Sequence, residues 1–260
     1  MIKYNELPNK TIIIAYKPIG NTPLEIIQEL KKLDKYKNTK MSYAGRLDPM
    51  AHGLMIILLD KECFNQHLYH NLNKTYRFKL LIGISSDTYD ILGKIVNNKN
   101  PIDSVNKINI KKTILSMNGL QTQFYPPYSS VRVKGNPLWY YAKHNLMDTI
   151  EIPSKNIEIK QIDILDETTI TRNELLKLVK ENINKISYKN STNFRQDEIL
   201  SLWETIGEYN YSIFTLKADV SCGTYIRSIC NAIGNKLNIP ALALDIYRTR
   251  VDSYNIELIN

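Results

Sequence analysis

Short apolar runs separated by polar turns predict most of the regular structure of this chain. Continuous or alternating apolar runs are typical of strands. They predict strands at residues 11–16, 54–59, 74–83, 214–222 and 241–251. Apolar residues at helical spacing predict helices after Thr22, at about 110–117 and after Gly223. The first of these helices begins with a capping box, Thr22 to Glu25, so its start is well defined.

A helical segment at about 166–209 interrupts this order. Thr171 and Glu174 have the spacing of a second capping box, which predicts the start of a helix. Apolar stripes follow on this helix and on another at about 197–206. The pattern predicts a helical hairpin that docks by its apolar stripes, and it assigns no chemistry to the hairpin.

Composition narrows the class of protein. The 260 residues carry a net charge of +8 and include 17 tyrosines. A basic surface with many aromatic rings suits RNA, although plain solubility explains the charge equally well. The three cysteines form no CxxC pair, so we expect neither a disulfide framework nor a metal site. We find no signal peptide or membrane-spanning run, and expect a cytoplasmic protein with no membrane association.

One carboxylate stands out in the stretch YAGRLDPMAHGL at residues 43–54. Asp48 lies between Gly45 and Gly53 and directly before Pro49. The proline disfavours a helical conformation at Asp48, and the glycines permit backbone shapes that other residues avoid. The sequence therefore predicts an acid on a tight loop. By itself, this pattern is more typical of a turn or a helix cap than of a catalytic site.

The segment at about 121–150 differs in composition from the rest of the chain. It contains prolines, a serine pair, Arg132, Lys134 and a cluster of Tyr and Trp side chains. Basic residues interleaved with aromatic ones suit a loop that contacts RNA. A packed surface excursion explains the composition equally well.

Arg227 falls in the first turn of the helix predicted after Gly223. A cation at this position opposes the helix dipole unless an anion compensates it. We therefore expect a carboxylate beside Arg227, and Asp48 is the candidate.

Several motifs together resemble one known family. GRLDPMAHGL, KTYRFKLLIG, DTYDILG, PPYSSVRVKG and GTYIRSICNAIG occur in this order, after an opening KPIGNTP. This succession resembles the bacterial tRNA pseudouridine-55 synthases, the TruB family. The resemblance implies an α+β (mixed α/β) pseudouridine synthase fold with a largely antiparallel central sheet flanked by helices, plus the helical insertion. It also implies one catalytic domain over residues 1–260. Because the chain stops soon after its last predicted strand, we expect no C-terminal RNA-binding domain.

The resemblance also implies a reaction and a set of site residues. The reaction is isomerisation of uridine to pseudouridine at position 55 in the T-loop of tRNA. Asp48 is then the essential carboxylate, acting at C1′, at the base or on a sugar proton, and Arg227 is its partner. Tyr76 resembles the tyrosine that stacks on the target base and helps catalysis. The residues that would line the base pocket are Tyr43, Tyr76, Tyr225 and Ile246.

The resemblance implies tRNA, through its T-arm, as the partner of a monomeric enzyme without metal or organic cofactor. The segment at 121–150 would grip that arm. Two alternatives stay open: a pseudouridine synthase acting on another RNA, or a catalytically inactive tRNA-binding or folding protein. Tyr43 and His52 differ from the residues usual in the family. These departures bear on the RNA substrate more than on the chemistry.

Overall fold

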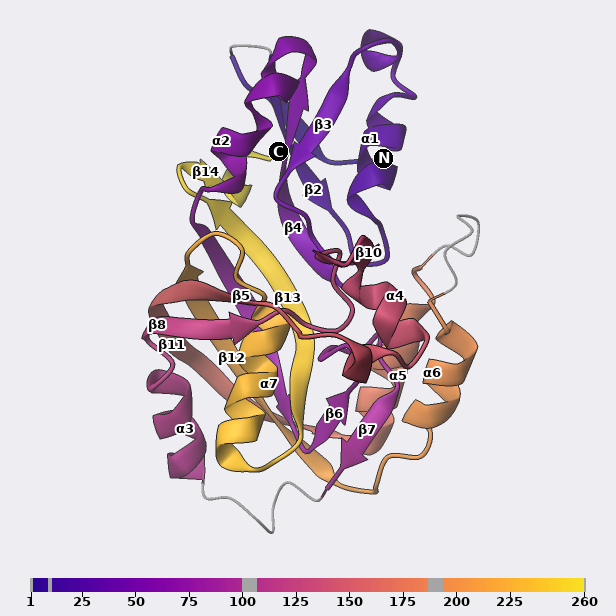
Figure 1. Ribbon diagram of the computed structural model, residues 1–260, viewed down its shortest axis with the longest axis vertical. Coiled ribbons are helices and arrows are strands. Elements are labelled where there is room, and N and C mark those ends of the chain that lie inside the picture. Colours follow the sequence, from indigo (N-terminus) through magenta and orange to yellow (C-terminus); the bar gives the residue numbers. More distant parts are fainter. Residues whose placement is uncertain (1, 9–10, 100–106, 187–193, 260) are drawn as a thin grey trace.

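One ten-stranded sheet runs through the described part of the chain in this computed structural model (Figure 1). The structure describes residues 2–8, 11–99, 107–186 and 194–259. The strands of the sheet are β1 (Tyr4–Glu6), β2 (Ile12–Lys17), β3 (Met41–Ala44), β4 (Ala51–Leu59), β5 (Lys74–Ile82), β8 (Gly119–Phe124), β11 (Ser154–Thr171), β12 (Asn210–Val220), β13 (Ala241–Val251) and β14 (Tyr254–Asn255). Two small separate pairs are β6 (Ile84–Ser86) with β7 (Ile95–Asn98), and β9 (Arg132–Val133) with β10 (Asn136–Pro137).

Helices lie on both faces of this sheet. The α-helices are α1 (Pro23–Leu30), α2 (Gln66–His70), α3 (Lys107–Leu115), α4 (Leu138–Lys143), α5 (Arg172–Ile183), α6 (Gln196–Trp203) and α7 (Ile226–Leu237). Short 3-10 helices are η1 (Asp34–Tyr36), η2 (Asp60–Asn65), η3 (Met147–Thr149) and η4 (Ile256–Leu258). The capping boxes expected at Thr22 and Thr171 both form, at the starts of α1 and α5.

Strand β13 joins the two halves of the sheet. The order is β1-β2-β4-β13-β5-β12-β11-β8, with β3 paired to β4 and β14 paired to β13. Each of these pairings is antiparallel except that of β13 with β4. The expected mixed α/β fold with a largely antiparallel sheet is therefore confirmed. Because β4 follows the Asp48 loop and β13 follows α7, this central pairing brings distant parts of the chain together.

The two faces of the sheet have different cores. On one face, α1, α3 and α7 pack their apolar residues against alternate side chains of β4, β5 and β13. On the other face, α5 and α6 cover a second cluster that includes Leu81, Ile213 and Leu242. Alternation along the strands separates these two sets, since successive side chains point to opposite faces.

Two expectations about the chain need correction. The helical insertion was expected from about 166, but residues 166–171 complete β11, where they pair with β12. The helical part lies between Thr171 and Asn210, and its residues 187–193 are outside the described part. The segment expected as a loop from 121 begins inside β8 and contains α4. Both corrections concern polar, exposed strands, which lack the apolar alternation that marks a half-buried strand.

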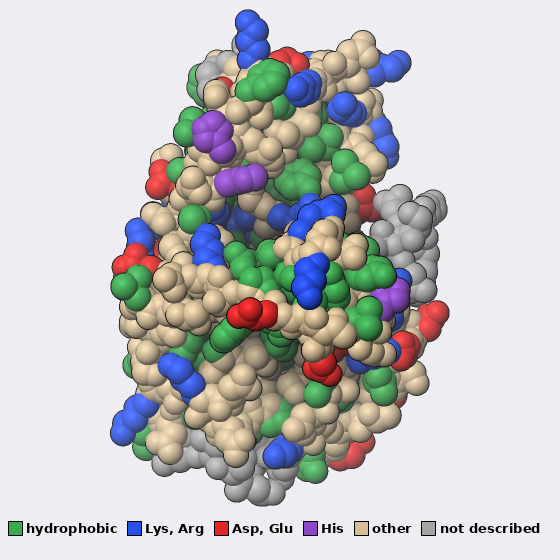
Figure 2. Space-filling model, viewed as in Figure 1, with side chains coloured by type: hydrophobic (Ala, Val, Ile, Leu, Met, Phe, Trp, Pro, Cys, Tyr) green, Lys and Arg blue, Asp and Glu red, His purple; other side chains and the backbone are tan. Residues whose placement is uncertain are grey.

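The surface is hollowed between the upper and lower halves of the molecule as drawn. Figure 2 shows Lys and Arg side chains gathered in and around this hollow, with apolar side chains beneath them. No helix in the described ranges is long and apolar enough to cross a membrane.

Candidate active site

The Asp48 loop connects β3 to β4. Asp48 has an irregular backbone, and the turn after it closes by a hydrogen bond from Ala51 N to Asp48 O at 3.0 Å. Gly45 and Gly53 have φ angles of +76° and +112°, which other residues rarely adopt. A Cβ on Gly53 would lie 2.3 Å from the backbone oxygen of Arg248 on β13. The tight loop expected here therefore exists, and Gly53 allows β13 to approach it.

Two buried basic side chains, Arg248 and Lys17, bind backbone carbonyl groups in and beside this loop. Arg248 is 1% exposed, and its guanidinium donates to the carbonyl oxygens of Leu54 at 2.8 Å and Gly45 at 2.9 Å. Lys17 is fully buried and donates to the Pro49 carbonyl at 3.3 Å. Burial lowers the pKa of Lys17 to about 7, although Asp48 nearby acts in the opposite direction. These contacts fix the backbone on both sides of Asp48.

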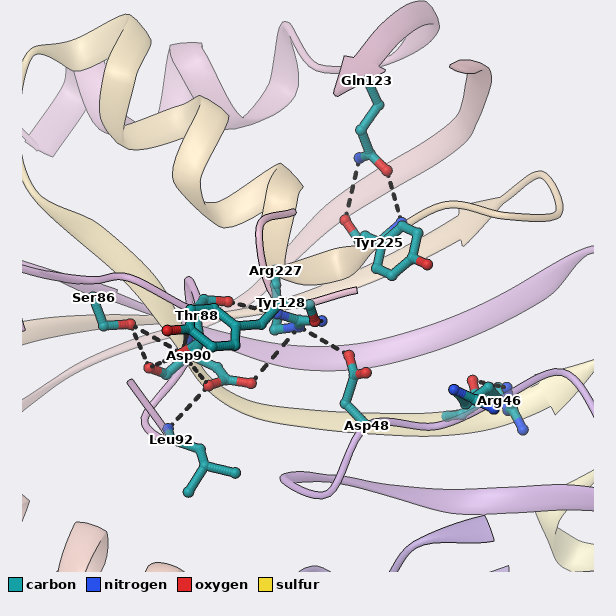
Figure 3. A network of polar contacts seen from close by, with 11 residues as sticks. Arg46, Asp48, Ser86, Thr88, Asp90, Leu92, Gln123, Tyr128, Tyr225 and Arg227 are labelled. Atoms are coloured by element: carbon teal, nitrogen blue, oxygen red, sulfur yellow. Dashed lines mark hydrogen bonds and ion pairs between the residues drawn. The ribbon is translucent and has the colours of Figure 1, made fainter. Parts of the chain in front are cut away.

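Arg227 lies beside Asp48 although 179 residues separate them in sequence. Arg227 Nε donates to Asp48 Oδ2 at 2.8 Å, as Figure 3 shows. The guanidinium comes from the first turn of α7 and its side chain is 3% exposed, whereas that of Asp48 is 31% exposed. Among the described contacts, no hydrogen bond reaches Asp48 Oδ1. The pairing expected from the helix-dipole argument is therefore present, and one carboxylate oxygen remains open.

A second carboxylate, Asp90, lies on the other side of Arg227. Its Oδ2 is 3.7 Å from Arg227 Nε, and its Oδ1 accepts from Thr88 Oγ1 at 2.7 Å and Leu92 N at 2.9 Å. Two carbonyl oxygens complete the surroundings of the guanidinium: Thr88 O at 2.6 Å and Tyr128 O at 3.3 Å. The guanidinium is thus held by four groups, and of its two carboxylate partners Asp48 is 31% exposed whereas Asp90 is 7% exposed (Figure 3).

Burial and charge oppose each other in this network. Burial alone would lower the pKa of Arg227, but the charges of Asp48 and Asp90 outweigh it and raise that pKa. Burial raises the pKa of Asp90 to about 6, while Arg227 acts to lower it. Arg227 is therefore charged at neutral pH and places that charge beside the Asp48 carboxylate.

Tyr225 precedes Arg227 at the start of α7. Gln123 on β8 binds its backbone twice, accepting from Tyr225 N at 2.8 Å and donating to Tyr225 O at 3.2 Å (Figure 3). The Tyr225 ring lies edge to face with Tyr125, with centroids 5.8 Å apart. Burial, and then the charge of Asp48, raise the pKa of Tyr225 to about 12, so its hydroxyl stays protonated.

Tyr76 and Ile246 lie on neighbouring strands beside the Asp48 loop. Tyr76 on β5 is opposite Arg248 on β13. Ile246 on β13 is opposite Ala51, three residues after Asp48. Both side chains are buried in the cluster that contains Leu47, at 7% and 5% exposed. These two residues therefore belong to the apolar core beside the Asp48 loop.

Tyr43 lies further out, on β3. Its hydroxyl accepts a hydrogen bond from Arg46 Nη2 at 3.0 Å, and its carbonyl accepts from Gln66 at 2.6 Å. Arg46 is two residues before Asp48, so Tyr43 contacts the loop rather than the carboxylate itself.

Sequence reasoning missed three parts of the site. Asp90 enters the sequence analysis only within the motif DTYDILG, and Arg248 only within the strand predicted at 241–251. Gln123 was one polar residue in a long segment. No signal in the sequence marks these residues, because Asp90, Arg248 and Gln123 meet Arg227, Gly45 and Tyr225 only in the folded protein. The described residues contain no cluster of three or more His, Cys, Asp or Glu side chains suited to a metal ion.

Comparison with known proteins identifies the family. Residues 31–180 match the family model described as TruB family pseudouridylate synthase (N terminal domain). The chain belongs to the TruB family. Curated members similar to it include tRNA pseudouridine synthase B of Thermotoga petrophila, 30% identical over 246 residues, and that of Clostridium tetani, 28% identical. Each alignment covers 95% of this chain, but only 64% and 69% of those relatives. The chain thus spans about two thirds of the length of these TruB relatives.

Solved structures share the fold at lower identity. A chain in the crystal structure of a Cbf5-Nop10-Gar1 complex has a TM-score of 0.54 and 17% identity. The match covers 91% of this chain and 47% of that one. A chain in an H/ACA RNP bound to a substrate RNA containing 2′-deoxyuridine gives a TM-score of 0.53, also at 17% identity. That match covers 94% of this chain and 48% of the other. At this identity the similarity establishes the fold of the TruB chain.

Proposed function

We propose that this protein isomerises uridine to pseudouridine at position 55 in the T-loop of tRNA. The observation that carries the proposal is the Asp48–Arg227 pair, in a TruB family chain whose relatives are named tRNA pseudouridine synthase B. A carboxylate with one oxygen on a buried arginine and the other open suits attack on a substrate, or removal of its proton. A loop tied by Arg248 and Lys17 keeps that oxygen in a fixed position.

The reaction needs one carboxylate and no outside reactant. The C1′–N1 bond breaks, the uracil turns, C5 joins C1′, C5 loses its proton, and N1 gains one. Asp48 starts this sequence at C1′, at the base or at a sugar proton. Bound RNA would cover the exposed part of Asp48 and exclude water that competes for the activated sugar. Because Arg227 is buried and positively charged, it places a compensating charge beside the Asp48 carboxylate in these drier surroundings.

The aromatic and apolar residues around Asp48 suit a base pocket. Tyr76 would stack on the turned-out uracil, and Ile246 and Tyr225 would line the pocket. Tyr43 would extend it at the Arg46 side. A uridine leaving its stack loses about a few kcal/mol, which aromatic contacts offset.

The remaining surface suits a tRNA arm. The basic hollow (Figure 2) fits a phosphate backbone, and the segment at 121–150, which supplies Tyr128 to the Arg227 site, would grip the T-arm. We infer that the chain forms one catalytic domain and acts as a monomer in the cytoplasm, where its tRNA substrate is found. It would use no metal or organic cofactor.

Release of tritium from unmodified tRNA labelled at C5 of its uridines tests this function. Wild type should release tritium and give one pseudouridine-specific stop, at position 55. Asp48→Asn keeps the size of the side chain but removes the carboxylate charge, so it should lower the rate at least about a thousandfold. RNA affinity should stay within about threefold of wild type, since phosphate contacts dominate that affinity.

Three results would contradict the proposal. A stop in ribosomal RNA but not in the T-loop would mean another RNA substrate. Salt-sensitive tRNA binding without tritium release would mean an inactive binding protein. Equal loss of activity and RNA binding in Asp48→Asn would give Asp48 a structural role.

A further inference from the structure

The helical insertion packs directly behind both loops of the candidate active site. Its buried apolar residues share one cluster with Met50, two residues after Asp48, and with Ile91 and Leu92, which follow Asp90. The buried residues of this cluster that lie on α5 and α6 are Leu175, Val179, Ile183, Ile199 and Trp203. The loops that carry Asp48 and Asp90, the two carboxylates beside Arg227, therefore pack against α5 and α6.

The backbone of the insertion also approaches the Asp48 loop closely. A Cβ on Gly20 would lie 2.5 Å from the backbone oxygen of Lys185, just after α5. Gly20 N in turn donates to Pro49 O at 2.9 Å. Only a glycine allows this contact. Gly20 therefore lies between Lys185, which follows α5, and Pro49, which follows Asp48, and it contacts both.

Arg195 extends from the start of α6 towards the other loop. Its guanidinium forms a bidentate ion pair with Asp87, in which Nη1 donates to Oδ2 at 2.6 Å and Nη2 donates to Oδ1 at 3.3 Å. The same guanidinium lies over the ring of Tyr128, 4.4 Å from the centroid. The side chains of Arg195 and Asp87 are 16% and 25% exposed, so this pair is screened by water less than a surface ion pair.

Of the two residues that Arg195 contacts, Tyr128 binds Arg227 directly, and Asp87 is next in sequence to Thr88, which also binds Arg227. Tyr128 O accepts from Arg227 Nη2, and Thr88 O, one residue after Asp87, accepts from Arg227 Nη1. Asp87 also closes its own loop, since its Oδ1 accepts from Lys94 N at 2.9 Å. Movement of Asp87 or Tyr128 would therefore shift a carbonyl oxygen that holds the guanidinium beside Asp48.

We propose that Arg195 is a positioning residue for the reaction. It fixes the Thr88 and Tyr128 carbonyl oxygens, and through them the Arg227 guanidinium beside Asp48. A planar guanidinium can bind a carboxylate with two donors and lie flat on an aromatic ring at once, which a lysine cannot do. The helical insertion thus takes part in building the active site. This inference rests on the proposed function.

The test compares Arg195→Ala and Arg195→Lys with Glu198→Gln in the full chain. Glu198 on the same helix pairs with Lys94 of the same loop, but its side chain is 54% exposed. We expect Arg195→Ala to lower the single-turnover rate at saturating tRNA about tenfold, because small displacements in an active site are costly. The tRNA dissociation constant should stay within about twofold, and Glu198→Gln should match wild type in both measurements.

Two further measurements separate positioning from support of the fold. Arg195→Lys should remain slow, and added guanidinium ion should restore part of the rate of Arg195→Ala but none of the rate of Arg195→Lys. In a protein that already carries Asp87→Asn, adding Arg195→Ala should lower the single-turnover rate by less than about twofold. Both changes remove the same ion pair, so their effects should not add.

A rate within about twofold of wild type for Arg195→Ala overturns the inference. The inference is also overturned if, in every variant including Glu198→Gln, the loss of rate is in proportion to the fall in melting temperature. Absence of tritium release by wild type would instead remove the proposed function, and is therefore distinct from failure of this inference.

Discussion

Arg227 divides two carboxylates into different roles by their exposure. Asp90 is 7% exposed in its side chain and has its Oδ1 bound by Thr88 and Leu92, whereas Asp48 keeps Oδ1 open. A buried guanidinium without anions would be costly, and a single exposed anion would leave it only partly compensated. Asp90 therefore supplies a second, buried partner for Arg227, so that Arg227 does not depend on Asp48 alone, as the proposed role of Asp48 requires.

The raised pKa of Asp90 predicts a pH-dependent stability. Burial raises that pKa to about 6, while an unfolded aspartate titrates near about 4. The folded protein binds this proton more tightly than the unfolded chain. Its contribution to stability is therefore complete below about pH 4 and is lost as the pH rises through 6. Asp90→Asn keeps an acceptor for Thr88 and Leu92 but cannot ionise. The difference in unfolding free energy, Asp90→Asn minus wild type, should therefore rise by about 2–3 kcal/mol between pH 4 and pH 7.

Urea unfolding of both proteins at the two pH values checks this difference. Asp148→Asn, at an exposed aspartate, is the control. A constant difference between wild type and Asp90→Asn would mean that Asp90 titrates in the folded protein as it does in the unfolded chain.

At the scale of elements, the pairing of β4 with β13 depends on one glycine. Gly53 has a φ of +112°, and a Cβ there would lie 2.3 Å from Arg248 O, a backbone atom that cannot move aside alone. Gly53→Ala should therefore cost about 2 kcal/mol or more, from backbone strain and steric conflict together. It should also lower activity, because Arg248 holds the Asp48 loop. Thermal unfolding and the tritium assay measure the two effects.

Gly119 provides a matched control for this substitution. Its φ is +99°, but a Cβ there would meet nothing within 4 Å. Gly119→Ala should thus carry the backbone strain without the steric conflict, and cost less than Gly53→Ala. Equal losses would mean that strain alone accounts for the Gly53 effect.

The sequence predicted elements well where apolar residues mark a buried strand or helix face, and poorly where a strand is polar and exposed. The central strands and the capping boxes follow from apolar spacing and local hydrogen bonds. The last part of β11 was assigned to the insertion because residues 166–171 are mostly exposed polar residues. Asp48 with Arg227 was predictable because a cation at a helix start needs an anion. Asp90, Arg248 and Arg195 were not, because their partners come from loops that meet only in the folded sheet.

At the scale of the whole molecule, the active site depends on the completed sheet. Arg227 reaches Asp48 only when α7 packs against the face formed by β4, β5 and β13. During refolding, we expect activity to appear at the rate at which β13 amides gain protection from hydrogen exchange. Protection of β2, whose partner β4 lies within 60 residues, should come earlier, since local pairing closes a shorter loop. Pulsed exchange beside the tritium assay gives both rates. Protection of β13 before β2, or well before activity, would contradict this order.

The central place of β13 also has a consequence for synthesis on the ribosome. Translation produces β4 and β5 long before residues 241–251, so both strands wait without their shared neighbour β13, and β5 also waits for β12. Open edges of apolar strands readily pair with other chains. A nascent chain of this protein is therefore exposed to misassembly from the synthesis of β5 until residues 241–251 are complete. A message cut short there would yield an aggregating product instead of a smaller folded one.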